Sequence, residues 1–123
     1  MKLIIIKTKL IENIIVIKPT ISINLGNRIS KFFLCDILFF ETTNIDHKLK
    51  LHTINGQFDF YGKLKHFEVQ LNTGFYKAHK SFLVNIATIS SIDKVNRIIH
   101  FVNDETCFVS AMYLKGLIKK CLI

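Results

Sequence analysis

Four hydrogen-bond donors stand within five positions near the middle of the chain: Lys77, His79, Lys80 and Ser81. Aromatic and β-branched residues flank them and give the segment an apolar face that can anchor in a core. Donors held on a rigid support suit a polyphosphate such as nucleic acid. A solvated strand edge blunted by lysines is the alternative, and it is the commoner meaning of a basic strand.

A surplus of basic residues narrows the class of partner. The chain of 123 residues holds 17 Lys and Arg against nine Asp and Glu, a formal net charge of +8. This surplus favours a polyanion, either nucleic acid or an acidic membrane, and charge alone does not separate the two. Half of the residues are hydrophobic, which predicts a single folded domain over residues 1–123.

Charge placement and cysteine usage indicate a cytoplasmic protein. No apolar run approaches the ~18 residues that cross a bilayer, because Lys7, Lys9 and Glu12 interrupt the N-terminal isoleucines. The same interruptions argue against a secretory signal peptide. The three cysteines are an odd, widely spaced set without a Cys-x-x-Cys pair, as is typical of free thiols in a reducing compartment. We expect Cys35 and Cys107 to be buried in the core.

The residue types that enzymes need are not grouped in this sequence. There is no evident nucleophile with its base, carboxylate pair or phosphate-binding glycine loop. His47 and His52 lack the spacing of a zinc-binding helix, and the stretch between them has the pattern of a strand. Asp46 next to His47 has no visible third partner for a catalytic triad. We therefore expect no enzyme activity, metal, cofactor or small-molecule substrate.

Strands and turns fill the first part of the chain. Residues 1–27 predict N-terminal strands of uncertain role, one or two before Pro19 and a half-buried one over 20–25. After a turn at Gly26-Asn27, the chain continues to a strand over 36–41. That strand is apolar on both faces, so other elements should cover both sides of it.

Two hairpins and two helices are predicted in the remainder. Asn55-Gly56 is a strong hairpin signal between strands over 48–54 and 57–61, the first alternating buried Leu with exposed Lys and His. A second hairpin turns at residues 103–105. Apolar spacing predicts a short helix over 63–71 and a C-terminal helix that Ser110 caps. The apolar stripe of that last helix comprises Leu114, Leu117, Ile118, Cys121 and Leu122, and Gly116 should weaken it by about 1 kcal/mol relative to alanine.

The sequence of the basic segment resembles a family signature. Residues 75–85 read Phe-x-Lys-x-His-Lys-Ser-Phe-x-Val-Asn, which is similar to the signature of the LytTR family of bacterial DNA-binding domains. The similarity runs from about Ile29 to the end of the chain, and several segments are closest to the agr-type quorum-sensing response regulators. Its further segments are Asp36–Glu41, Phe60–Lys65, Ile89–Asp93 and Cys107–Ser110.

The resemblance implies a fold and a mode of DNA binding. The fold would be mainly β, with small stacked antiparallel sheets, one short internal helix and a C-terminal helix. Loops would enter the major groove, and bases would be contacted from the positions of His47, Lys80 and Met112. Met112 departs from the usual arginine and has no donor, so it would touch a thymine methyl group or, as we expect, pack on the helix.

The remaining donors are assigned to the DNA backbone or to the structure. His79 is expected to be a structural histidine with its hydrogen bonds satisfied. Expected phosphate contacts are Lys48, Lys77, Ser81, Ser110 and Lys115.

The sequence thus predicts a transcription regulator that binds specific duplex DNA, with two copies on tandem sites. The alternative is a protein-interaction or antagonist module that keeps the fold and has lost specific DNA binding.

Overall fold

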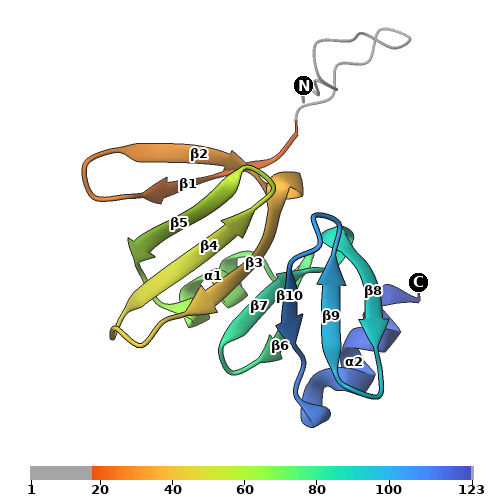
Figure 1. The fold of residues 1–123 in the computed structure, drawn as a ribbon. Coiled ribbons are helices and arrows are strands. Elements are labelled where there is room, and N and C mark those ends of the chain that lie inside the picture. The colour runs from red at the N-terminus through yellow and green to blue at the C-terminus, as the bar shows by residue number, and fades with distance from the viewer. Residues whose placement is uncertain (1–17, 123) are drawn as a thin grey trace, which may run out of the picture.

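The computed structural model describes residues 18–122, which form three antiparallel sheets and two α-helices (Figure 1). This is the mainly β arrangement that the family resemblance implies. The strands are β1 (Thr20–Asn24), β2 (Ile29–Phe33), β3 (Ile37–Thr42), β4 (Lys48–Thr53), β5 (Gly56–Tyr61), β6 (Phe75–His79), β7 (Phe82–Asn85), β8 (Ile89–Asp93), β9 (Ile98–Phe101) and β10 (Thr106–Phe108). The helices are α1 (Leu64–Gln70) and α2 (Ala111–Cys121). The strands expected before Pro19 fall mostly outside the described residues.

The five-stranded sheet is the middle layer, in the order β5-β4-β3-β7-β6. Its central strand β3 is buried on both faces, as its apolar run predicts. Ile37 and Phe40 pack in one core with the β1–β2 hairpin and α1, while Leu38 and Phe39 pack in a second core with β9 and α2. A register shift against β4 accompanies this change of side. Two outer layers are therefore tied to one strand.

Local turn chemistry produces the predicted hairpins. β4 pairs with β5 across Asn55-Gly56, where Gly56 has φ 133°, a value that side chains disfavour. β9 and β10 are joined by a turn in which Asp104 has φ 71°, and they complete the three-stranded sheet β10-β9-β8. One part of the β4 prediction is wrong, because His52 is buried and only 6% exposed. It is held there by the carboxylates of Glu41 on β3 and of Glu105 in the turn between β9 and β10.

Asn85 ties the signature segment to the start of β3. Its side chain is 4% exposed, and Nδ2 donates to the carbonyl oxygens of Leu34 (3.0 Å) and Ile37 (2.8 Å). Its Oδ1 accepts from the N–H of Ala87. A buried amide that satisfies three backbone groups fixes the two neighbouring turns, residues 34–36 and residues 86–88. Cys35 lies in the first of these turns and is exposed, so the prediction that it is buried is wrong, whereas Cys107 is buried as expected.

Helix α2 begins where predicted but without the predicted cap. Ser110 occupies the N-cap position, yet its hydroxyl makes no capping hydrogen bond, and its Oγ is buried without a partner. The Ser110 N–H instead donates to the carbonyl of Ala78 at 2.8 Å, which draws the residue toward β6. Of the predicted apolar stripe, Leu117 is buried, whereas Cys121 and Leu122 are exposed at the end of the helix.

Gly116 lets α2 approach β6 closely. A Cβ at this position would overlap the hydroxyl oxygen of Tyr76, which donates to the carbonyl of Tyr113 at 3.2 Å. Although alanine has the higher helix propensity, we predict that Gly116→Ala lowers the free energy of unfolding by about 1–3 kcal/mol. Urea unfolding measures this. Tyr76→Phe in the same background should recover part of the loss, and a Gly116→Ala variant more stable than wild type contradicts the prediction.

Candidate nucleic-acid interface

Three loops that carry the predicted base-contacting residues lie along one edge of the molecule. They are the β3–β4 loop with His47, the β6–β7 turn with Lys80, and the start of α2 with Met112, all at the lower edge of Figure 1. Backbone hydrogen bonds join neighbouring loops. The N–H of Thr42 donates to the carbonyl of Ser81 at 3.0 Å, and that of Ser110 to the carbonyl of Ala78. The fold therefore brings together residues from distant parts of the chain.

His47 is presented at the tip of its loop. It has φ 62°, a conformation in which histidine is more frequent than most residues. Its carbonyl accepts from the N–H of Gly62 at 2.8 Å. Gly62 leaves little room for a side chain, because a Cβ there would lie 3.3 Å from the rings of Phe60 and Phe67. The His47 side chain is 58% exposed, with Nε2 3.4 Å from Asp46 Oδ2, and is free to reach a ligand.

The β6–β7 turn separates an exposed lysine from a structural histidine. Lys80 is exposed in the turn, with Ser81 half-buried beside it. The N–H of Ser81 donates to Nδ1 of His79 at 3.1 Å, so Nδ1 carries no proton in this arrangement. The His79 ring lies against Phe82, with 5.3 Å between the ring centroids. His79 thus makes the internal contacts expected of a structural residue, and Lys80 is available to a partner.

Met112 does not pack on the helix, so that prediction is wrong. Its side chain is 80% exposed in the first turn of α2. The inward face of this helix is taken by Tyr113, Leu114 and Leu117, which contact the second core. Met112 therefore projects beyond the core at the same edge as His47 and Lys80.

The predicted phosphate contacts differ in their access to solvent. Lys115 is exposed, whereas Lys48 and Lys77 are half-buried; the Lys48 ammonium lies 5.8 Å from the ring centroid of Tyr61. Ser110 fits its prediction poorly, because its hydroxyl oxygen is buried under the start of α2.

Arg97 is a further cation at this edge that the sequence analysis did not select. It lies in the β8–β9 turn with φ 55°, and its side chain is exposed. Its carbonyl accepts from the N–H of Val109 at 3.1 Å. Arg97, His79 and Ala111 line one hollow of about 460 Å³ at the start of α2. In the sequence, the position of Arg97 directly after Asn96, a residue that favours turns, indicates a turn.

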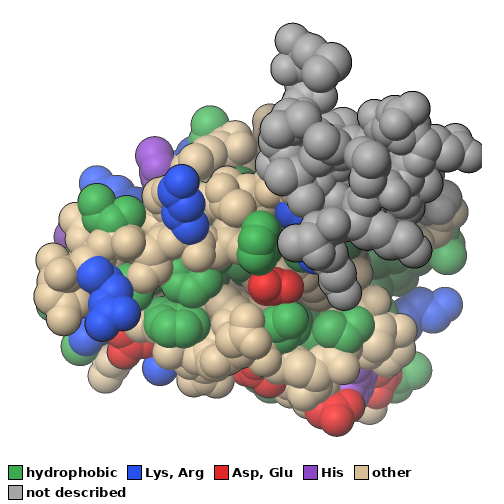
Figure 2. Space-filling view, turned by 90° about the horizontal axis from the view of Figure 1, so that it is seen from above, with side chains coloured by type: hydrophobic (Ala, Val, Ile, Leu, Met, Phe, Trp, Pro, Cys, Tyr) green, Lys and Arg blue, Asp and Glu red, His purple; other side chains and the backbone are tan. Residues whose placement is uncertain are grey.

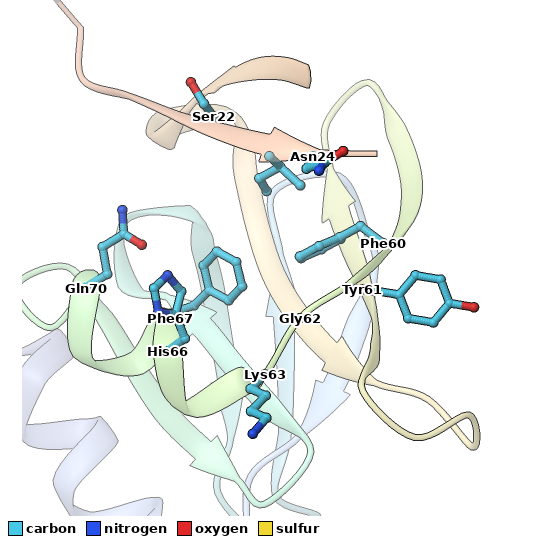
Figure 3. Close-up of a pocket in the computed structure, with 10 residues that line it drawn as sticks. Ser22, Asn24, Phe60, Tyr61, Gly62, Lys63, His66, Phe67 and Gln70 are labelled. Atoms are coloured by element: carbon cyan, nitrogen blue, oxygen red, sulfur yellow. The ribbon is translucent and has the colours of Figure 1, made fainter. Parts of the chain in front are cut away.

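Elsewhere the surface has a different character. A hollow of about 520 Å³ between β1, β5 and α1 has the rings of Phe60 and Phe67 in its wall, while Tyr61 points away from it (Figure 3). Basic, acidic and hydrophobic side chains are interspersed on the uncovered part of the face opposite the loop edge (Figure 2). Within residues 18–122 there is no group of three or more His, Cys, Asp or Glu placed to hold a metal ion. None of the helices described is long and apolar enough to span a membrane.

The chain is similar to known DNA-binding domains. The model of the LytTr DNA-binding domain family matches residues 27–121. Accessory gene regulator protein A of Staphylococcus epidermidis is 43% identical over 82 residues, which are 67% of this chain and 34% of that protein. The protein of the same name from Staphylococcus aureus gives the same values. The chain thus spans about a third of the length of these relatives.

A solved structure has the same fold. It is the LytTr DNA-binding domain of a methyl-accepting/DNA response regulator from Bacillus cereus. The TM-score is 0.68 at 22% sequence identity, over 82% of this chain and 97% of that chain. At this level of identity the likeness concerns the fold.

Proposed function

The chain belongs to the LytTr DNA-binding domain family, and we propose that it is a bacterial transcription regulator that binds specific duplex sequences through the three loops. The observation that carries this proposal is that the loops of His47, Lys80 and Met112 lie along one edge and that each of these residues is exposed. The role is cytoplasmic and non-enzymatic, as in a regulator that acts on DNA. Its relatives are accessory gene regulator proteins.

Each base-contacting residue offers a different chemistry. The imidazole of His47 offers a donor or an acceptor to a base edge. Lys80 donates to O6 and N7 of guanine as a point charge, without the fork of an arginine. Met112 offers only an apolar contact, which suits the methyl group of thymine. These contacts specify the sequence, while phosphate contacts set the position of the protein on the duplex.

Phosphate contacts come from cations around the same edge. We assign them to Lys48, Lys77, Lys115 and Arg97, with Ser81 as an uncharged donor. Two copies on tandem sites would double both sets of contacts. A gel-shift titration with labelled duplex at low salt tests binding itself: Lys80→Glu, which reverses one charge at the edge, should bind more weakly than wild type. Equal affinities of the two proteins contradict this placement of the interface.

Met112 provides a test of the third base contact. Because Met112 is exposed at the start of α2, Met112→Arg adds a bidentate donor without disturbing the core. We predict tighter binding to sites with guanine at one position by about 1–3 kcal/mol, measured by titration of duplexes that differ at that position. The melting temperature should be unchanged. Lower stability with unaltered base preference contradicts the exposed placement.

A further inference from the structure

His52 joins two sheets through a polar cluster in which its own ring is buried and the two carboxylates are half-buried. It lies on β4, where its Nε2 is 2.7 Å from Oε1 of Glu41 on β3, in the same sheet. Its Nδ1 is 2.7 Å from Oε1 of Glu105, which belongs to the β9–β10 turn of the three-stranded sheet. The ring stacks on Phe39 with 4.0 Å between centroids, and Phe39 stacks in turn on Phe101 of β9. One imidazole thus connects the middle layer to an outer layer.

Glu105 is held from several directions. Gln57 Nε2 on β5 donates to its Oε1 at 3.2 Å, and Asn103 Nδ2 donates to its Oε2 at 2.7 Å. Burial alone would raise the pKa of Glu105, but hydrogen bonds from Asn103, His52 and Gln57 leave the pKa below its usual value. Burial, together with the charge of Glu41, raises the pKa of the neighbouring Cys107 thiol, which stays neutral. The carboxylate of Glu105 is therefore kept charged and fixed in place.

The hydrogen bonds of His52 to both carboxylates require one additional proton in the cluster. A neutral imidazole has one N–H donor, yet both ring nitrogens of His52 face carboxylate oxygens at hydrogen-bond distance. Both contacts are satisfied only when the cluster holds one proton more than a neutral imidazole and two carboxylates. Removing one partner leaves a buried charged or polar group without its bond, so the three side chains act as a unit.

This cluster is a polar attachment between the two layers, in addition to the packing of the second core. The five-stranded sheet carries the loops of His47 and Lys80, whereas the three-stranded sheet carries Arg97 and leads into α2. Toward the loop edge the two parts are joined by the Ser110–Ala78 backbone hydrogen bond and by the bond from the Tyr76 hydroxyl to the carbonyl of Tyr113. The β9–β10 turn with Glu105 lies at the other end of its sheet (Figure 1). Polar attachments at both ends of the contact therefore define the angle between the sheets more closely than the core packing alone.

We propose that His52 is a positioning residue for base recognition, because its bonds to Glu41 and Glu105 set the angle between the sheets that carry the DNA-contacting loops. The role rests on the proposed function. A change of this angle moves Met112 and Arg97 relative to His47 and Lys80. Base contacts need a fixed geometry, whereas phosphate contacts made by flexible lysines tolerate such a shift.

Glu105→Gln tests the role, with Asp104→Asn as the matched control. Both changes remove one carboxylate from the same turn, so they raise the net charge equally. Asp104 is exposed with φ 71°, which asparagine tolerates. Affinity is measured on a duplex selected by the wild type and on random duplex. We expect Glu105→Gln to lower the ratio of the two affinities about tenfold, and Asp104→Asn to leave it unchanged. His52→Gln, which keeps one donor, should also lower it.

Two further readouts separate positioning from stability alone. Residual dipolar couplings of the free protein measure the angle between the sheets, which we expect to differ from wild type in Glu105→Gln and not in Asp104→Asn. Equal losses on both duplexes together with a lower melting temperature overturn the proposal. So does a specificity ratio that survives in a folded Glu105→Gln. A wild type that does not distinguish its selected duplex from random duplex contradicts the proposed function itself.

Discussion

Raising the salt concentration from about 50 to about 200 mM is expected to weaken DNA binding roughly 150-fold. The estimate counts four cations at the loop edge, Lys48, Lys77, Arg97 and Lys115, each releasing counterions from one phosphate. Four such contacts predict a slope of about −3.6 in a plot of log affinity against log salt. Anisotropy titrations of labelled duplex across a salt series measure the slope, and a flat response contradicts binding through phosphates.

The slope also tests which cations make the contacts. Lys77→Ala should reduce its magnitude by about one unit and weaken specific and random duplexes by similar factors. Lys31→Ala is the control, because Lys31 is exposed on β2, away from the loop edge (Figure 1). It removes the same charge and should leave the slope unchanged. If both variants change the slope equally, net charge rather than a defined contact governs binding.

The double variant His47→Ala/Lys80→Ala should lose about 2–6 kcal/mol of binding free energy on the preferred duplex, since each base contact is worth about 1–3 kcal/mol and separated positions add. On random duplex the loss should be much smaller, because base contacts specify and phosphate contacts position. Competition titrations on the two duplexes give both values. The expected signature is therefore a collapse of specificity with most general affinity retained.

A matched double variant controls for the loss of one histidine and one lysine. His66 on α1 and Lys31 on β2 are both exposed, and neither belongs to the three loops. His66→Ala/Lys31→Ala should therefore keep the specificity ratio of the wild type. Similar losses on both duplexes for His47→Ala/Lys80→Ala would remove these residues from the base-contacting set. The single variants then identify which of the two fails.

Features set by neighbouring residues could be predicted from the sequence. Asn55-Gly56 determines its hairpin through backbone conformation, and the apolar run of β3 requires cover on both faces. The family resemblance implied loops as the DNA-contacting parts, and Lys80 lies in a turn. In each case the physical cause lies within a few positions of the residue concerned.

Features that depend on distant contacts could not be predicted. The alternation of β4 predicts an exposed His52, but Glu105, 53 positions away, holds it in the interior. Ser110 has the residue type of a cap, yet its N–H bonds to Ala78 on β6 and its hydroxyl is buried. By helix propensity Gly116 is expected to weaken α2, but in the fold it makes room for the hydroxyl of Tyr76. Met112 was expected to pack on the helix, but Tyr113, Leu114 and Leu117 occupy the inward face of α2 and leave Met112 exposed.

Selection of bound duplexes from a random pool tests the central claim most directly. The protein is mixed with duplexes of random sequence, bound molecules are recovered and amplified over several rounds, and the pool is sequenced. Sequence-specific binding through three loops predicts enrichment of one motif, with guanine favoured opposite Lys80 and thymine or relaxed preference opposite Met112. A recovered pool as random as the starting one would show that the domain does not distinguish sequences and would contradict the proposed function.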